Sequence, residues 1–284
     1  IGAKELILTL PGAVLLFLFL DYTAQQKPYF WRDAMLLLLP MVLVLGGYLL
    51  VRSYALGGIF FFPDMEARTP WVNLFTQVSV IAFYYIPRIF FPFLLNLDPQ
   101  IPEIQSLASG PFWGALAVLV LLIGIGAACY KKRPLLAFGI GWFFITISVT
   151  SSFIPLLDLA AEHRLYLPLA GFVLALESLV LYLASRPLPQ RTAIFVPVLC
   201  AVLLVVTLTR NVEYTNAVLM WRNSAVLSPT KFRPMRNMGA ALIQQGETDQ
   251  AVSMFSSKYK GVGADRRNMV SVEDVEFTIS LLIP

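Results

Sequence analysis

The chain has 284 residues, of which 58% are hydrophobic and 13% charged, with a net charge of +4 and a mean hydropathy of +0.73. Soluble domains carry about 25% charged residues, so this composition excludes a disordered chain, a collagen-like repeat and a disulfide-stapled secreted module, and it indicates a membrane protein with several spans. Cytoplasmic-loop lysines and arginines explain the modest charge better than a nucleic-acid surface does, so no nucleic-acid partner is expected.

The apolar runs predict an all-α polytopic membrane protein with about six crossings, because a helix needs about 20 apolar residues to cross the hydrocarbon core. The six runs are Leu6–Leu20, Ala34–Val51, Pro111–Tyr130, Leu135–Leu157, Leu165–Ser185 and Thr192–Thr209. A seventh apolar stretch, Trp71–Leu97, is interrupted by Pro87, Arg88 and Pro92. Residues 1–209 are therefore predicted to form a membrane domain.

Basic residues predict which loops stay in the cytoplasm. They lie in the loops after the first, third and fifth runs, at Lys27, Arg32, Lys131, Lys132, Arg133, Arg186 and Arg191. If these three loops are inside, Trp71–Leu97 cannot cross once. It must enter and return as a re-entrant segment, or lie along the outer interface. Everything after Arg210 is then expected outside the cytoplasm.

Residues 210–264 predict extracytoplasmic helices that resemble a tetratricopeptide repeat. Gly239, Gly246, Ala251 and Phe255 have the spacing of a close helix contact, a turn and two buried positions on the second helix. One such repeat cannot bury its own face, because at least three are needed for stability. The pattern ends after Phe255, so we expect residues 265–284 to form an irregular tail from a cut or aberrant C-terminus.

Ionisable residues at a membrane edge are energetically costly, so each cluster of them is a functional candidate. The clusters are Lys4 with Glu5; Asp64 and Glu66 with Arg68; Asp98 with Glu103; and Glu162, His163, Arg164 and Tyr166 at the outer end of the fifth run. Arg164 is the residue best suited to grip a phosphate, through paired hydrogen bonds. The alternatives are an interface anchor for the fourth cluster and a snorkelling pair for the first.

Motifs of other enzyme classes are missing from the sequence. There is no glycine-rich nucleotide loop and no paired Cys or His metal set, so we predict no metal site and disfavour a nucleotide-driven pump. Cys129 and Cys200 lie in apolar runs, where helix packing is the expected role.

The order of these segments resembles the tetratricopeptide-bearing GT-C glycosyltransferases, which include the eukaryotic TMTC O-mannosyltransferases and bacterial relatives. The resemblance covers nearly all of residues 1–257. It rests on Lys4-Glu5, on Leu95-Asn96-Leu97-Asp98, on Glu162-His163-Arg164-Leu165-Tyr166-Leu167-Pro168 and on the helical tail.

This resemblance implies a transferase that takes a sugar from a polyprenyl- or dolichyl-phosphate carrier. The acceptor is implied to be an extracytoplasmic protein held by the repeat helices. The implied substrate-binding residues are Lys4, Glu5, Glu162, His163, Arg164 and Tyr166, with Arg164 on the carrier phosphate and Lys4 as a second positive charge. In this family the catalytic acid lies in an earlier outer loop, so it is expected upstream of Ile1 and the chain is expected to be a C-terminal part.

The implied location is the bacterial inner membrane with a periplasmic tail, or the endoplasmic reticulum membrane with a lumenal tail. Two other functions stay open. The chain could be a non-catalytic membrane scaffold that presents the repeat helices, or another lipid-linked-sugar enzyme such as an oligosaccharide ligase. A secondary transporter is disfavoured, because the spans show no internal repeat.

Overall fold

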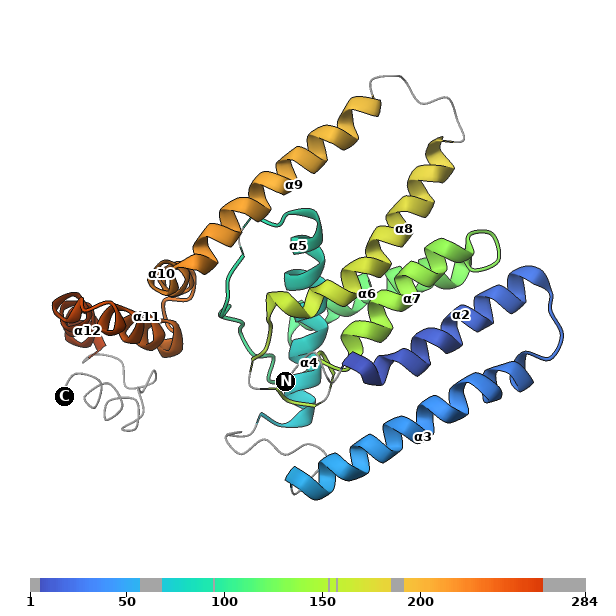
Figure 1. The fold of residues 1–284 in the computed structure, drawn as a ribbon, viewed down its shortest axis with the longest axis horizontal. Coiled ribbons are helices and arrows are strands. Elements are labelled where there is room, and N and C mark those ends of the chain that lie inside the picture. Colours follow the sequence, from blue (N-terminus) through green and yellow to red (C-terminus); the bar gives the residue numbers. More distant parts are fainter. Residues whose placement is uncertain are drawn as a thin grey trace. The chain divides into compact units, whose positions relative to one another are not determined.

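A computed structural model describes residues 6–56, 68–93, 95–152, 154–156, 158–184 and 192–262. Within these ranges every regular element is helical. The chain divides into two compact units (Figure 1), of which unit 1 comprises Ile1–Phe91 and Pro102–Pro189 and unit 2 comprises Pro92–Ile101 and Gln190–Pro284. The predicted all-helical class is therefore confirmed.

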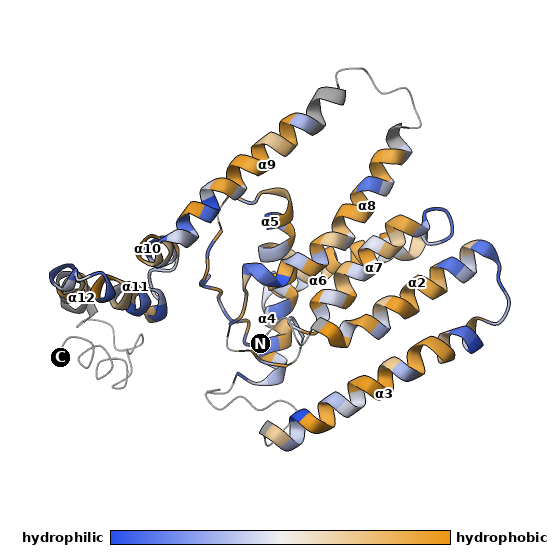
Figure 2. Ribbon diagram, viewed as in Figure 1, coloured by the Kyte–Doolittle hydropathy of each residue, from blue (hydrophilic) through white to orange (hydrophobic). Residues whose placement is uncertain are grey.

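Five helical segments are long and apolar enough to cross a membrane, namely Ile7–Gln25, Phe30–Ala55, Gly110–Cys129, Glu162–Tyr182 and Pro197–Thr215. They correspond to η1 (Leu6–Thr9) with α2 (Leu10–Gln25), α3 (Phe30–Leu56), α6 (Gly110–Cys129), η3 (Glu162–Leu165) with α8 (Tyr166–Ala184), and α9 (Thr192–Thr215). Figure 2 shows apolar residues along the length of these helices. Many of their large apolar side chains are exposed, as expected for a helical membrane protein rather than a soluble one.

The fourth predicted span, Leu135–Leu157, is helical only over α7 (Pro134–Ser148). Fifteen residues rise about 22 Å, which is less than the roughly 30 Å of the hydrocarbon core. Just after α7, the Thr150 hydroxyl and the Ser151 backbone N–H both donate to the Ile147 carbonyl. These hydrogen bonds end the helix, and the run is therefore a shorter helix followed by a loop. The prediction of a full span rested on the number of apolar residues and did not include such hydrogen bonds.

Helices α7 and α8 cross closely at small residues. A Cβ added to Gly139 would lie 2.3 Å from the Gly171 carbonyl oxygen and 2.7 Å from the Ala175 nitrogen. The Trp142 indole N–H donates to the Leu167 carbonyl, 2.8 Å away, and ties the same two helices together. Small residues let membrane helices approach until their backbones touch, which gives dispersion contacts that bulkier residues would prevent.

We therefore expect Gly139→Ala to destabilise the protein. Overpacking costs about 1–3 kcal/mol, and each kcal/mol lowers Tm by about 2–4 °C in a chain of this size. The control is Gly124→Ala, because no atom lies within 4 Å of a Cβ at that position. Thermal unfolding of both variants in the same detergent checks this, and equal Tm values would contradict the proposed backbone contact.

Residues 70–90 form one helical segment of three parts, α4 (Pro70–Ser79), the π-helical η2 (Val80–Tyr85) and α5 (Ile86–Phe90). Beyond it, the Ile104 N–H donates to the Thr76 hydroxyl, 2.9 Å away, and Glu103 pairs with Arg68 at 3.7 Å. The chain thus returns to the end of unit 1 at which α4 begins. That Trp71–Leu97 does not cross the membrane once stays a prediction.

Two basic loops gather at the other end of unit 1. The Phe19 ring near the end of α2 stacks on the Tyr130 ring at the end of α6, with centroids 5.9 Å apart. Arg133 lies 3.2 Å from the ring centre of Tyr182 near the end of α8. The Lys27 loop and the 131–133 loop therefore share one face, as the charge pattern predicts. Arg186 and Arg191 lie outside the described residues.

Unit 2 contains α10 (Ala217–Leu227), α11 (Phe232–Gln244) and α12 (Thr248–Val262). Gly239 of α11 touches the Phe255 ring of α12, because an added Cβ would lie 2.4 Å from the ring. Gly246 adopts a positive φ of 82° in the turn between the helices, which favours glycine. The predicted helical hairpin is present, and its assignment to the tetratricopeptide family stays a prediction. The predicted irregular tail, 265–284, lies outside the described residues.

Candidate functional site

The candidate site is built around Arg164, in the short 3₁₀ turn η3 that leads into α8. Only 8% of Arg164 is exposed, and its guanidinium donates to the Asp158 carbonyl at 3.0 Å. It also interacts with the hydroxyl of Tyr85. That hydroxyl accepts a hydrogen bond from the Ala161 N–H at 3.1 Å, and Tyr85 is fully buried. The guanidinium therefore has a fixed position, which favours a binding role.

Two buried amides on α4 hold the loop that precedes Arg164. Asn73 donates to the Ser152 carbonyl at 2.6 Å and to the Ile154 carbonyl at 3.1 Å, while Gln77, one turn later, donates to the Leu159 carbonyl at 2.8 Å. Both amides are 2% exposed or less. Their side-chain carbonyl oxygens accept no hydrogen bond from any residue that the structure describes. Each oxygen could thus accept a hydrogen bond from a water or a ligand hydroxyl.

A second guanidinium, that of Arg68, belongs to the same site. It donates to the Leu156 carbonyl of the loop and pairs with Glu103, and its charge interacts with those of Asp158 and Arg164. Burial lowers the pKa of Arg68, the two carboxylates oppose that shift, and Arg164 adds to it. An arginine stays protonated in proteins, so the site holds two fixed positive charges.

This arrangement can bind an anion. Two guanidiniums present forked N–H donors that match phosphate oxygens. The nearby carboxylates, Asp158 and Glu103, partly compensate these positive charges. Their presence also means that a ligand must compete for the guanidinium donors, which favours a phosphate with several oxygens over a weak acceptor.

The structure brings one of the six predicted substrate-binding residues, Arg164, into the core of this site. Glu162 lies on the same turn and is half-buried, His163 is exposed, and Tyr166 is 79% exposed at the start of α8. Lys4 and Glu5 lie outside the described residues, as do Asp64 and Glu66. The predicted pairing of Lys4 with Arg164 therefore stays a prediction.

No sequence motif singles out Tyr85, Asp158, Asn73 or Gln77. One available signal was the spacing of Asn73 and Gln77, which places two amides on one face of an apolar helix. Asp158, an isolated acid between apolar residues, was the other. Arg68 was grouped with Asp64 and Glu66, and the contact with Glu103 could not be read from the sequence.

Asp98 and Glu103 were predicted as one cluster, but the structure gives them different partners. Glu103 pairs with Arg68 in unit 1, whereas Asp98 belongs to unit 2. There Asp98 is 1% exposed and binds the ammonium of Lys231 at 2.5 Å and the guanidinium of Arg233 at 2.7 Å. Burial raises the pKa of the Asp98 carboxyl, but the hydrogen bonds and the positive charges of Arg233 and Lys231 together outweigh it, and the net pKa is below the ordinary value.

Asp98, Lys231 and Arg233 together are called the Asp98 clamp, and the neighbouring Asn96 adds further hydrogen bonds to it. Its amide donates to the Ser228 hydroxyl at 2.8 Å, and that hydroxyl donates to the Asp98 carbonyl at 2.7 Å. The Leu95-Asn96-Leu97-Asp98 segment thus holds the start of α11 within unit 2. This contact network gives the segment a structural role.

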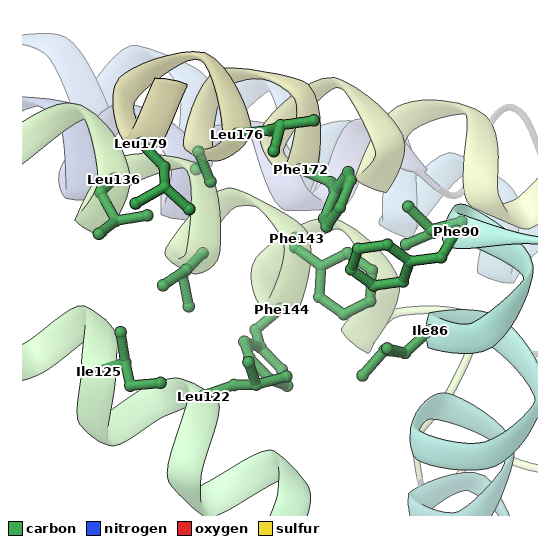
Figure 3. A pocket seen from close by; sticks show the side chains of 14 residues that line it. Ile86, Phe90, Leu122, Ile125, Leu136, Phe143, Phe144, Phe172, Leu176 and Leu179 are labelled. Carbon is green, nitrogen blue, oxygen red and sulfur yellow. The ribbon is translucent and has the colours of Figure 1, made fainter. Parts of the chain in front are cut away.

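An apolar cavity of about 280 Å³ lies between α5, α6, α7 and α8 (Figure 3). All its lining residues are apolar, and the rings of Phe90 and Phe172 meet edge to face with centroids 5.0 Å apart. Phe172 follows Arg164 by eight residues along α8, a rise of about 12 Å. The cavity is therefore suited to a hydrocarbon chain rather than to a polar ligand.

Among the residues that the structure describes, no three His, Cys, Asp or Glu side chains gather closely enough to hold a metal ion.

Comparison of the chain with protein-family models, with curated proteins and with solved structures gave no match.

Proposed function

We propose that this chain belongs to a membrane glycosyltransferase that takes a sugar from a polyprenyl-phosphate carrier and passes it to an extracytoplasmic acceptor. Arg164 and Arg68 bind the phosphate of the carrier in this proposal. The observation that carries it is the pair of guanidiniums held beside one loop: Arg164 donates to the Asp158 carbonyl and interacts with the Tyr85 hydroxyl, and Arg68 donates to the Leu156 carbonyl.

The apolar cavity supports a lipid-linked donor. A carrier with a phosphate at Arg164 has its isoprenoid chain in the apolar part of unit 1, and the cavity on α8 offers a place for the first part of that chain. A soluble sugar nucleotide has no chain to fill it. The positive-inside rule assigns the Arg164 end to the non-cytoplasmic side, because the basic loops lie at the other end.

Binding of three probes to the purified chain in detergent tests this proposal. We expect a polyprenyl phosphate to bind more tightly than either the uncharged polyprenol or inorganic phosphate, since each of these lacks one half of the contact. Equal binding of polyprenol and polyprenyl phosphate would contradict a phosphate site.

The cavity itself is tested by Leu176→Trp, which fills it, with Val173→Trp as the control. Both residues are exposed on α8, at 44% and 53%, but only Leu176 lines the cavity. We expect Leu176→Trp to weaken binding of the polyprenyl phosphate and Val173→Trp to leave it unchanged.

A membrane scaffold that presents the unit 2 helices is the second candidate. The Asp98 clamp favours it, because Lys231 and Arg233 fix the start of α11 whether or not unit 1 is catalytic. A scaffold predicts no specific binding of polyprenyl phosphate. An oligosaccharide ligase predicts the same phosphate binding with a glycan acceptor in place of a protein.

A further inference from the structure

A groove runs between α2, α3 and α7 towards the basic end of unit 1, away from Arg164. Its volume is about 810 Å³. A water molecule takes up about 30 Å³ of the liquid, so the groove has room for a much larger ligand. Along α2 it extends from Gly12 to Thr23, about 16 Å at the helical rise, and it continues to Lys27 in the loop after the helix. Leu15, Leu16 and Ile145 give it apolar walls, whereas Tyr22, Thr23 and Lys27 line one end. A hydrocarbon chain with a polar head matches this distribution.

Lys27 lines the polar end of the groove, and Lys131 lies on the neighbouring loop. The Lys27 ammonium lies 2.7 Å from the Asp21 carboxylate and 5.7 Å from the centre of the Tyr22 ring. An ammonium has three N–H donors, so this one contact leaves donors for a second anion. The Lys131 ammonium lies 5.6 Å from the centre of the Tyr130 ring, which in turn stacks on Phe19 of the groove.

The charge of this end is positive overall. The described loops 21–33 and 129–134 hold five basic side chains and two acidic ones. Tyr29 and Trp31 are 68% and 74% exposed beside them, as aromatic residues are at the headgroup level of a bilayer. Basic pockets between membrane helices on the cytoplasmic side bind anionic lipid headgroups.

We propose that this groove binds an anionic glycerophospholipid, with its phosphate between Lys27 and Lys131 and an acyl chain between α2 and α3. Charge complementarity selects this occupant, because a zwitterionic lipid adds no net negative charge to a basic rim. The site is distinct from the Arg164 site, and it does not depend on the proposed transferase activity.

Lipid retention tests the proposal. The full chain is reconstituted in vesicles of equal parts phosphatidylglycerol and phosphatidylcholine, extracted in mild detergent, and its retained lipids are measured by mass spectrometry. We expect the ratio of retained phosphatidylglycerol to retained phosphatidylcholine to exceed the ratio in the vesicle, and this excess is the enrichment. In Lys27→Gln/Lys131→Gln the retained ratio falls by about fivefold or more, because each basic side chain near an anionic surface contributes about that factor.

Two matched variants separate the groove from general effects of charge and bulk. Arg222→Gln removes an exposed charge from α10 and leaves the enrichment unchanged. Leu15→Trp fills the groove and abolishes the enrichment without altering charge, whereas Leu39→Trp on the exposed part of α3 does not. The proposal is overturned if phosphatidylglycerol is not enriched, or if the double lysine variant and Leu15→Trp both retain it like the parent chain.

Discussion

Replacing Arg164 with alanine is expected to weaken polyprenyl-phosphate binding by about tenfold to a hundredfold and to abolish the proposed sugar transfer. Each hydrogen bond to a charged group contributes about 1.5–3 kcal/mol, and a fork to a phosphate makes two of them. The side chain is buried in the turn η3, so no neighbouring surface residue takes its place. Titration of the variant with a polyprenyl phosphate measures the loss.

Arg164 also stabilises its own loop, so the variant needs controls. Arg164→Lys keeps the charge but loses the planar fork, and its affinity is expected to lie between those of the parent and the alanine variant. Arg68→Ala removes the second guanidinium and is expected to weaken binding as well. Arg222→Gln, which removes a charge from α10, should bind like the parent. Parent-like binding by a folded Arg164→Ala variant would refute the phosphate site.

The largest effect on stability is expected for Asp98→Asn in unit 2. The substitution leaves Lys231 and Arg233 side by side without their shared counter-ion, and removing one partner of a buried ion pair costs about 3 kcal/mol. Since a protein with two units does not unfold in one step, hydrogen exchange of the α11 amides is the appropriate measurement. We expect their exchange to be about a hundredfold faster, which is the factor that 3 kcal/mol represents.

Glu213→Gln is the matched control, because Glu213 pairs with Arg210 within α9 and is 31% exposed. Partly exposed pairs three residues apart on one helix contribute only about 0.3–0.5 kcal/mol. If the two variants exchanged equally fast, Asp98 would not be the residue that holds the start of α11.

The same cluster predicts a pH dependence. Because the Asp98 pKa is lower in the folded protein than the ordinary value of about 3.9, its contribution to stability is complete above that value. It is lost as the pH falls through the lower, folded pKa. Hydrogen exchange measured from pH 6 downwards is expected to show this loss in the parent chain and not in Asp98→Asn.

The sequence predicted the helices better than it predicted their ends. Long apolar runs identify α2, α3, α6, α8 and α9, because a membrane span is set by length and hydropathy. It overestimated α7, since Thr150 and Ser151 stop that helix through hydrogen bonds to a single carbonyl. Such a stop depends on where each hydroxyl and N–H donates, which composition does not reveal.

Of the candidate site, the sequence predicted Arg164 but not its surroundings. A buried guanidinium needs partners, and these come from segments far apart in the chain. Tyr85 lies 79 residues before Arg164, and the amides of α4 hold the loop across a similar separation. The sequence also did not reveal that Asp98 and Glu103, which are close in the chain, have different ion-pair partners.

A structure of this chain with bound polyprenyl phosphate is the decisive test of the phosphate site. We expect phosphate density in contact with the guanidiniums of Arg164 and Arg68, and density for the adjoining isoprenoid chain in the cavity beside Phe172. Phosphate density at Lys27 and Lys131 alone, with none at Arg164, would contradict it.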